Sequence, residues 1–142
     1  MSTALYTAEA HVAGGRNGTG RTSDGQLDLE LRQPKQMGGD GDGTNPEQLF
    51  AIGYAACFAT TLTLIGRRSQ LPADDVAVDS SVSLLPLEGG RFQLGVELRI
   101  SLPSLTADQA AGLVRTAHQV CPYSNATRDN IDVALIANEV SL

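Results

Sequence analysis

Two cysteines are the residues of this sequence best suited to covalent chemistry. Cys57 lies within an uncharged, apolar stretch, and Cys121 directly precedes a proline. A thiolate can act as a nucleophile, bind a metal or form a disulfide, whereas a buried thiol often serves only as a small apolar core residue. For Cys57 taken alone, the core role is the simpler interpretation. The two cysteines are far apart along the chain, so whether they form a reactive pair depends on the fold.

A nucleophilic role for Cys57 requires a cationic neighbour, because burial in an apolar environment raises the pKa of a thiol. Arg16 is a candidate, since it lies in the glycine-rich turn 14–18, where backbone without side chains permits a close approach to a pocket. The alternative interpretation is that Arg16 is an ordinary solvated turn residue. Glu47 could hold such an arginine through a two-point contact. A glutamate in the first turn of a helix is, however, also favoured by a capping box and by the helix dipole.

The spacing of Glu47 and Cys57 suggests that a second subunit is needed. Both residues are predicted to lie on one helix, where they are separated by about 15 Å along the axis at about 1.5 Å per residue. Glu47 is therefore poorly placed to reach Cys57 of its own chain. If the two residues serve one site, we expect the glutamate to come from the partner subunit of a dimer.

Metal and hydrolase chemistry have less support. His118 and Cys121 have a metal-like local spacing, but His11 and Cys57 are dispersed, whereas zinc sites usually combine two close pairs. The acidic loop 40–43 lacks the later ligands of a calcium loop. A Cys–His hydrolase using His118 stays open as an alternative, yet neither cysteine lies in a glycine-flanked nucleophile elbow. We therefore expect no metal and no cofactor.

The charge of the chain argues against nucleic acid and membrane partners. The 142 residues carry a formal net charge of -6, and the ten basic residues form no cluster. Nucleic acid and anionic membranes are both bound mainly through clustered positive charge. The N-terminal residues show no secretory signal, so we expect a cytoplasmic protein with its thiols in a reducing compartment. The length fits one domain, residues 1–142.

The first part of the chain predicts strands and then one long helix. Alternating apolar and polar residues predict strands over 5–12, 19–23 and 27–32, with Asn-Gly and Asp-Gly turn pairs between them. A glycine-rich loop follows, and a helix is predicted from about Pro46 to Arg68. This helix has no polar stripe before its last turn, so we expect protein on all sides of it, including a second subunit. Its hydropathy is low for a membrane span of this length.

The remainder predicts strands over 76–84, 92–102 and 131–140. Thr106 and Gln109 form a capping box at the start of a helix that ends at Pro122, and a short turn or helix follows. Short turns join most of the strands, which favours antiparallel sheets packed against helices. The predicted fold class is α+β.

Four motifs taken together resemble one known family. They are Gly14-Gly15-Arg16-Asn17-Gly18, Thr44-Asn45-Pro46-Glu47-Gln48-Leu49-Phe50, Gly53-Tyr54-Ala55-Ala56-Cys57-Phe58, and Cys121-Pro122-Tyr123-Ser124-Asn125-Ala126 with Asn130-Ile131-Asp132-Val133. In this order they are similar to the organic hydroperoxide resistance branch of the Ohr/OsmC family. The similarity extends from about Leu5 to Val140.

The resemblance implies an OsmC-like α+β fold, an intertwined homodimer and a peroxidase site at the subunit interface. By motif position it implies that Cys57 is the peroxidatic cysteine and Cys121 the resolving cysteine. It likewise implies that Arg16 stabilises the thiolate and that Glu47 holds Arg16. The implied substrates are alkyl or lipid hydroperoxides rather than hydrogen peroxide. The implied reductant is an external dithiol carried by a lipoylated protein.

Apolar residues near Cys57 are expected to form the substrate pocket. We predict Phe50, Phe58, Met37 and Tyr123 as its lining. Two alternatives remain: a binding protein whose cysteines are only core residues, and an OsmC-like enzyme with a different peroxide preference. Thiol reactivity tests the first alternative, and a comparison of peroxide substrates tests the second.

Overall fold

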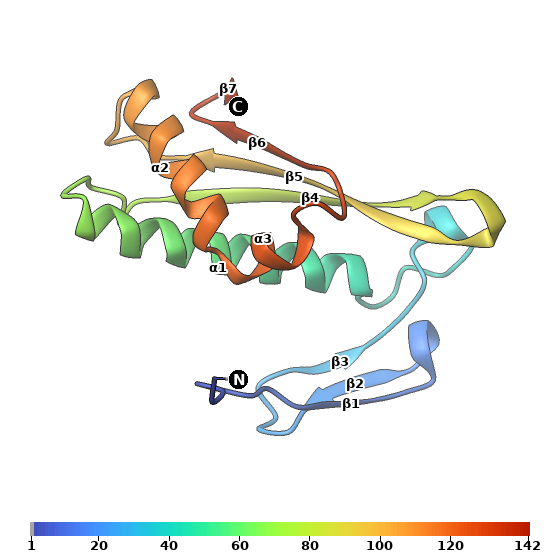
Figure 1. The fold of residues 1–142 in the computed structure, drawn as a ribbon. Helices are drawn as coiled ribbons and strands as arrows, with labels where there is room; N and C mark the ends of the chain where they lie inside the picture. The colour runs from blue at the N-terminus through green and yellow to red at the C-terminus, as the bar shows by residue number, and fades with distance from the viewer. Residues whose placement is uncertain (1) are drawn as a thin grey trace. The chain divides into compact units, whose positions relative to one another are not determined.

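The computed structural model describes residues 2–142, which fall into two compact units (Figure 1). The first unit ends at Leu49 and contains a three-stranded sheet, whereas the second, Phe50–Leu142, contains a four-stranded sheet. Helix α1 (Pro46–Arg68) begins in the first unit and continues through the second. The α+β fold class is confirmed. That residues 1–142 act as one domain stays a prediction.

The sheet of the first unit is antiparallel, in the order β1-β2-β3. Its strands are β1 (Ala10–Ala13), β2 (Thr19–Thr22) and β3 (Asp28–Glu30). All three were expected, although β1 covers only the end of the predicted strand. A 3-10 turn, η1 (Gly15–Asn17), connects β1 to β2. A second 3-10 turn, η2 (Lys35–Met37), follows β3.

Helix α1 starts where the sequence predicted, with the cap on Asn45. The Asn45 side-chain oxygen accepts from the backbone N–H of Gln48 at 2.9 Å, and Pro46 occupies the first helical position. The Thr44 hydroxyl donates to the Gln48 side chain at 2.7 Å. Thr44 therefore forms no capping box with Glu47, which leaves the Glu47 carboxylate free for another contact.

The sheet of the second unit has the order β4-β5-β6-β7. Its strands are β4 (Ala77–Pro86), β5 (Phe92–Ser101), β6 (Val133–Ala137) and β7 (Val140–Ser141), with the 3-10 turn η3 (Glu88–Gly90) between β4 and β5. The predicted antiparallel pairing is confirmed for β4 with β5 and for β6 with β7, but β5 and β6 are parallel. Two helices connect these strands, and such a crossover allows the chain to return in the same direction.

Helices α2 (Ala107–Val120) and α3 (Pro122–Thr127) form that crossover. The predicted capping box of α2 is confirmed, since the Thr106 hydroxyl accepts from Gln109 N–H at 3.2 Å and Gln109 Oε1 accepts from Thr106 N–H at 3.0 Å. In the core of the unit, the buried faces of α1, α2 and β5 pack against one another. Figure 1 shows α1 running along the sheet.

Among the described residues, α1 is the one helix long and apolar enough to cross a membrane by length and composition. Core helices of globular proteins pass the same test. Three of its large side chains, Tyr54, Phe58 and Leu62, have no exposed surface and belong to the core. Helix α1 is therefore a core element of the second unit.

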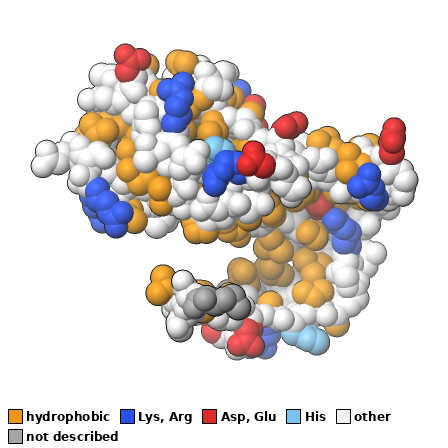
Figure 2. Space-filling model, in the orientation of Figure 1, with side chains coloured by type: hydrophobic (Ala, Val, Ile, Leu, Met, Phe, Trp, Pro, Cys, Tyr) orange, Lys and Arg blue, Asp and Glu red, His pale blue; other side chains and the backbone are white. Residues whose placement is uncertain are grey.

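The opposite side of α1 is apolar and exposed in this chain. Ile52 is 70% exposed and Leu64 is 44% exposed, and the exposed Ala56 lies between them at helical spacing. In Figure 2, hydrophobic side chains gather over this helix. The expectation that protein covers all sides of α1 is therefore not met within one chain.

Asn138 fixes the connection between β5 and α2 from a tight turn between β6 and β7. Its side chain accepts from Leu102 N–H at 2.7 Å and donates to the Leu102 carbonyl at 3.0 Å. Asn138 and Glu139 both have positive φ, 46° and 67°, which is why the strand predicted over 131–140 is split. Asparagine tolerates this conformation better than most residues.

Replacing Asn138 by alanine is therefore expected to lower the free energy of unfolding by about 1–3 kcal/mol, because two polar groups of the buried Leu102 lose their partner. Urea denaturation measures the loss. Glu139→Gly serves as the control in the same turn, where relief of the positive φ is expected to stabilise by about 1 kcal/mol. An unchanged midpoint for Asn138→Ala would contradict the role of this side chain.

Candidate active site

The two cysteines, on α1 and at the α2–α3 junction, lie side by side in the second unit. The Cys121 thiol donates to the Cys57 sulfur at an Sγ–Sγ distance of 3.6 Å, and both cysteines are free thiols. Cys121 is completely buried, whereas Cys57 is partly exposed. A disulfide has an S–S distance of about 2.05 Å, so a two-electron oxidation with a small approach of the sulfurs would close the bond.

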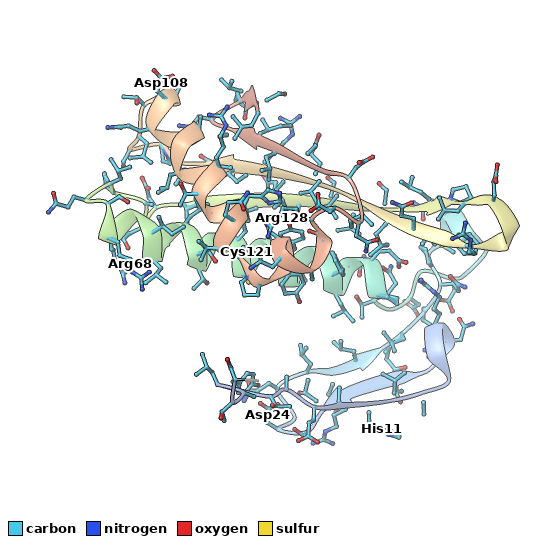
Figure 3. All side chains as sticks on the ribbon, viewed as in Figure 1. His11, Asp24, Arg68, Asp108, Cys121 and Arg128 are labelled. Atoms are coloured by element: carbon cyan, nitrogen blue, oxygen red, sulfur yellow. The ribbon has the colours of Figure 1, made fainter. Side chains whose placement is uncertain are left out.

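The chain turn at Cys121 is held by backbone hydrogen bonds on both sides. Cys121 ends α2, where its N–H donates to Ala117 at 2.8 Å, and it precedes the first residue of α3, where its carbonyl accepts from Asn125 at 2.9 Å. Pro122 opens α3 because it lacks an N–H that could continue α2. Figure 3 labels Cys121 at this junction.

Burial raises the pKa of the Cys57 thiol. The backbone N–H of Tyr123 acts in the opposite direction, since its hydrogen bond to the Cys57 sulfur favours the thiolate, while the neighbouring Cys121 raises the pKa further. Within one chain, burial therefore disfavours the thiolate form of Cys57. A nucleophilic Cys57 therefore needs positive charge in addition to these neighbours.

Tyr123 covers the helix turn before Cys57. Its ring packs against Tyr54 at a centroid distance of 5.4 Å and against Phe50 at 5.6 Å. Gly53 makes this approach possible, because a Cβ atom at position 53 would lie 3.0 Å from Tyr123 Cζ and closer still to its hydroxyl. A side chain at position 53 would therefore force the end of the Tyr123 ring to shift.

Gly53→Ala is expected to displace Tyr123 and to weaken its N–H contact with Cys57, with a stability loss of about 1–3 kcal/mol from overpacking. Thermal denaturation and the pH dependence of Cys57 alkylation measure the two effects. The control is Gly112→Ala in α2, where an added Cβ meets nothing within 4 Å and helix propensity predicts a gain of about 1 kcal/mol. Equal responses of the two variants would refute the steric argument.

Arg16 and Glu47 form a two-point ion pair in the first unit. Arg16 Nη1 donates to Glu47 Oε2 at 2.9 Å, and Arg16 Nη2 donates to Glu47 Oε1 at 2.7 Å. Hydrogen bonding to Arg16 lowers the pKa of Glu47, and the same bond raises the pKa of Arg16. Gly14 and Gly15, with φ of 82° and 57°, shape the turn that carries the arginine. Glu47 thus holds a guanidinium that is 31% exposed.

The four predicted pocket residues occupy different environments. Phe50 lines a surface cavity of about 510 Å³ together with Leu87, Phe92 and Leu94, among others. Phe58 is completely buried, and Met37 is 46% exposed. Tyr123 is half-buried beside Cys57. Their contact with a substrate stays a prediction.

His118 faces a hydroxyl group instead of a cysteine. Its Nδ1 lies 2.8 Å from the Ser124 hydroxyl, and the same hydroxyl lies 2.7 Å from that of Tyr54. Burial, and then the charge of Arg128, lowers the pKa of His118.

No cluster of metal ligands occurs among residues 2–142. No role was expected for Tyr54 and Ser124, because residues far apart in the chain can be recognised as partners only once the fold is known.

A long core helix that carries one cysteine, with the second cysteine at the junction of two crossover helices, is the arrangement of an OsmC-like protein. The family model described as OsmC-like protein matches residues 39–136. The chain belongs to the OsmC-like family. Within it, the chain groups with the organic hydroperoxide resistance proteins, as its motifs indicated.

Two curated relatives carry that description. The organic hydroperoxide resistance protein of Xanthomonas axonopodis pv. citri (strain 306) is 51% identical over 133 residues, which cover 92% of this chain and 93% of the relative. The organic hydroperoxide resistance protein OhrB of Bacillus subtilis (strain 168) is 42% identical over 133 residues, covering 93% and 97%.

Solved structures agree with this grouping. An organic hydroperoxide resistance protein of Legionella pneumophila superposes with a TM-score of 0.90 at 47% identity, covering 94% of this chain and 97% of that one. The structure of Bacillus subtilis OhrB gives a TM-score of 0.85 at 42% identity, with coverage of 93% and 98%. The fold and the family are thus established together.

Proposed function

We propose that this protein is a thiol-dependent peroxidase that reduces organic hydroperoxides to alcohols. The observation that carries the proposal is the free thiol pair, with the partly exposed Cys57 sulfur 3.6 Å from the buried Cys121 sulfur. An accessible thiol can meet a peroxide, while a shielded thiol beside it is spared direct oxidation. The names of the relatives support hydroperoxides as the substrate class.

The reaction has two steps at these sulfurs. The Cys57 thiolate attacks the terminal oxygen of R–O–OH, the O–O bond breaks, and the alkoxide takes up a proton to leave as the alcohol. Cys57 is then a sulfenic acid. The Cys121 sulfur attacks the Cys57 sulfur, the S–O bond breaks, and the hydroxide leaves as water with the thiol proton. The resulting disulfide requires two electrons from an external dithiol.

Activation of Cys57 is assigned to the Arg16–Glu47 pair of a second subunit. A guanidinium beside the sulfur favours the thiolate and offsets the effect of burial on its pKa. Glu47 lies roughly 15 Å along α1 from Cys57 of its own chain, which supports a contribution in trans. The exposed apolar side of α1, with Ile52 and Leu64, supports a homodimer because a partner would remove it from water.

The remaining features are proposed from the family resemblance. Phe50, Met37 and Tyr123 offer apolar surface that suits an alkyl or lipid hydroperoxide better than hydrogen peroxide, and Phe58 supports them from the core. A lipoylated protein is the proposed dithiol donor. The reaction needs no metal or other cofactor, and we propose the cytoplasm as its location.

Stoichiometric oxidation tests the proposal directly. Reduced protein is mixed with tert-butyl hydroperoxide or with hydrogen peroxide, and the products are mapped by mass spectrometry at successive times. We expect a Cys57–Cys121 disulfide that forms much faster with the organic peroxide. In the Cys121→Ser control we expect an over-oxidised Cys57. Thiols that stay unmodified would instead favour the binding-protein interpretation, in which both cysteines are core residues.

A further inference from the structure

A cluster of buried hydroxyl groups lies beside the thiol pair and takes no part in the chemistry described above. The Tyr54 hydroxyl lies 2.7 Å from that of Ser124 and 3.2 Å from that of Thr127. Tyr54 and Ser124 have no exposed surface, and Thr127 is 4% exposed. His118 closes the cluster through Nδ1, 2.8 Å from the Ser124 hydroxyl. Such a set of buried polar groups is stabilising only while every member keeps a partner.

The cluster connects the same elements that carry the two sulfurs. Tyr54 lies on α1 one turn before Cys57, so the two side chains share a face of the helix. Ser124 and Thr127 lie on α3, of which Cys121 is the N-terminal cap. His118 lies in the last turn of α2, one turn before Cys121.

Arg128 binds the cluster from the other end of α3. Its Nη1 donates to the His118 carbonyl at 2.8 Å, and its backbone N–H donates to the Ser124 carbonyl at 2.8 Å. Its second guanidinium nitrogen bonds to the Asn125 side chain. The ends of α2 and α3 are thereby joined to each other, and Tyr54 joins them to α1.

We propose that Tyr54, Ser124 and His118 are positioning residues that hold Cys121 in place for attack on oxidised Cys57, an inference that rests on the proposed peroxidase function. None of the three touches the peroxide. Their action is on the second step, because the Cys121 sulfur must move from 3.6 Å to bonding distance while its backbone stays anchored to Ala117 and Asn125. A firm turn keeps the effective concentration of the resolving thiol high.

Loosening the cluster therefore slows disulfide formation and leaves the Cys57 sulfenic acid exposed to a second peroxide. The observable quantity is the partition of Cys57 between disulfide and sulfinic acid under excess peroxide. This ratio compares two fates of the same sulfenic acid, so it does not depend on the rate at which the sulfenic acid forms. The rate of the first step, followed by trapping the sulfenic acid with a dione reagent, stays unchanged.

The experiment compares Tyr54→Phe and Ser124→Ala with the unmodified protein under excess tert-butyl hydroperoxide. Tyr54→Phe removes a single oxygen and keeps the ring packing, so it is the variant most certain to fold. We expect the ratio of disulfide to sulfinic acid to fall about tenfold in each, since a lost buried hydrogen bond is worth about 1.4 kcal/mol, or a factor of ten. His118→Asn, which can present an amide oxygen to Ser124, should restore most of the ratio that His118→Leu loses.

Asn138→Ala is the matched control, because it removes hydrogen bonds to the buried Leu102 in the same unit, and none of these bonds involves α3 or either cysteine. Its partition is expected to equal that of the unmodified protein. A normal partition in Tyr54→Phe and Ser124→Ala would overturn the inference while leaving the peroxidase proposal intact. Failure of the unmodified protein to form any sulfenic acid or disulfide would instead overturn the proposed function itself.

Discussion

Replacing Cys57 by serine is expected to reduce hydroperoxide turnover by a factor on the order of 10³ or more, to the level of the buffer control. The hydroxyl of serine has no accessible anionic form near neutral pH and does not form the sulfenic acid that carries the oxygen atom away from the peroxide. Removal of the nucleophile in other enzymes has effects of this size or larger. Turnover is measured by loss of tert-butyl hydroperoxide with a dithiol present in excess.

The matched variant is Cys121→Ser, which leaves the attacking sulfur in place. We expect it to consume about one equivalent of peroxide rapidly and then to lose activity as Cys57 proceeds to sulfinic acid. The two variants thus separate the first step from the second. Full turnover by Cys57→Ser would assign the chemistry elsewhere, and equal behaviour of the two variants would show that neither sulfur has a distinct role.

The fold was largely predictable because local signals were strong. Thr106 and Gln109 marked the start of α2, and Pro46 marked that of α1. The errors arose where tertiary structure decides. The parallel pairing of β5 with β6 follows from the crossover through α2 and α3, and hairpin turns elsewhere in the sequence had favoured antiparallel pairing. The break at Asn138 depends on hydrogen bonds to Leu102, which no local pattern reveals.

The candidate site was predictable to a different degree for each residue. Reasoning from the residues left open whether Cys57 is a core residue or one of a reactive pair, and the family resemblance implied its pairing with Cys121. The fold then placed the two sulfurs 3.6 Å apart. The Arg16–Glu47 contact was proposed from side-chain chemistry and is present with two hydrogen bonds. Their catalytic roles remain predictions.

Arg16→Met is expected to lower the rate of Cys57 oxidation near pH 7 by about 100-fold. Burial raises the Cys57 pKa, and an arginine beside a titrating group lowers its pKa by about 1–3 units, so the loss of Arg16 leaves far less thiolate. As pH rises, the remaining thiol ionises, so the oxidation rate of Arg16→Met should increase about tenfold per pH unit until it approaches that of the unmodified protein. Stopped-flow oxidation across pH 6–10 measures this recovery.

Glu47→Gln and Arg21→Met complete the test. Glu47→Gln keeps the cation of Arg16 but removes the charge that orients it. The oxidation rate of Glu47→Gln should therefore lie between those of Arg16→Met and the unmodified protein, and its pH profile should shift less than that of Arg16→Met. Arg21 is largely exposed and lies 4.0 Å from Asp28 in its ion pair, which makes Arg21→Met a control for general loss of positive charge in the same unit. Its rate is expected to stay within about twofold of normal, because exposed charges interact weakly over distance. A slow Arg16→Met variant that stays slow at high pH would mean that Arg16 acts by positioning the peroxide, whereas recovery with pH identifies the thiolate as the group it stabilises.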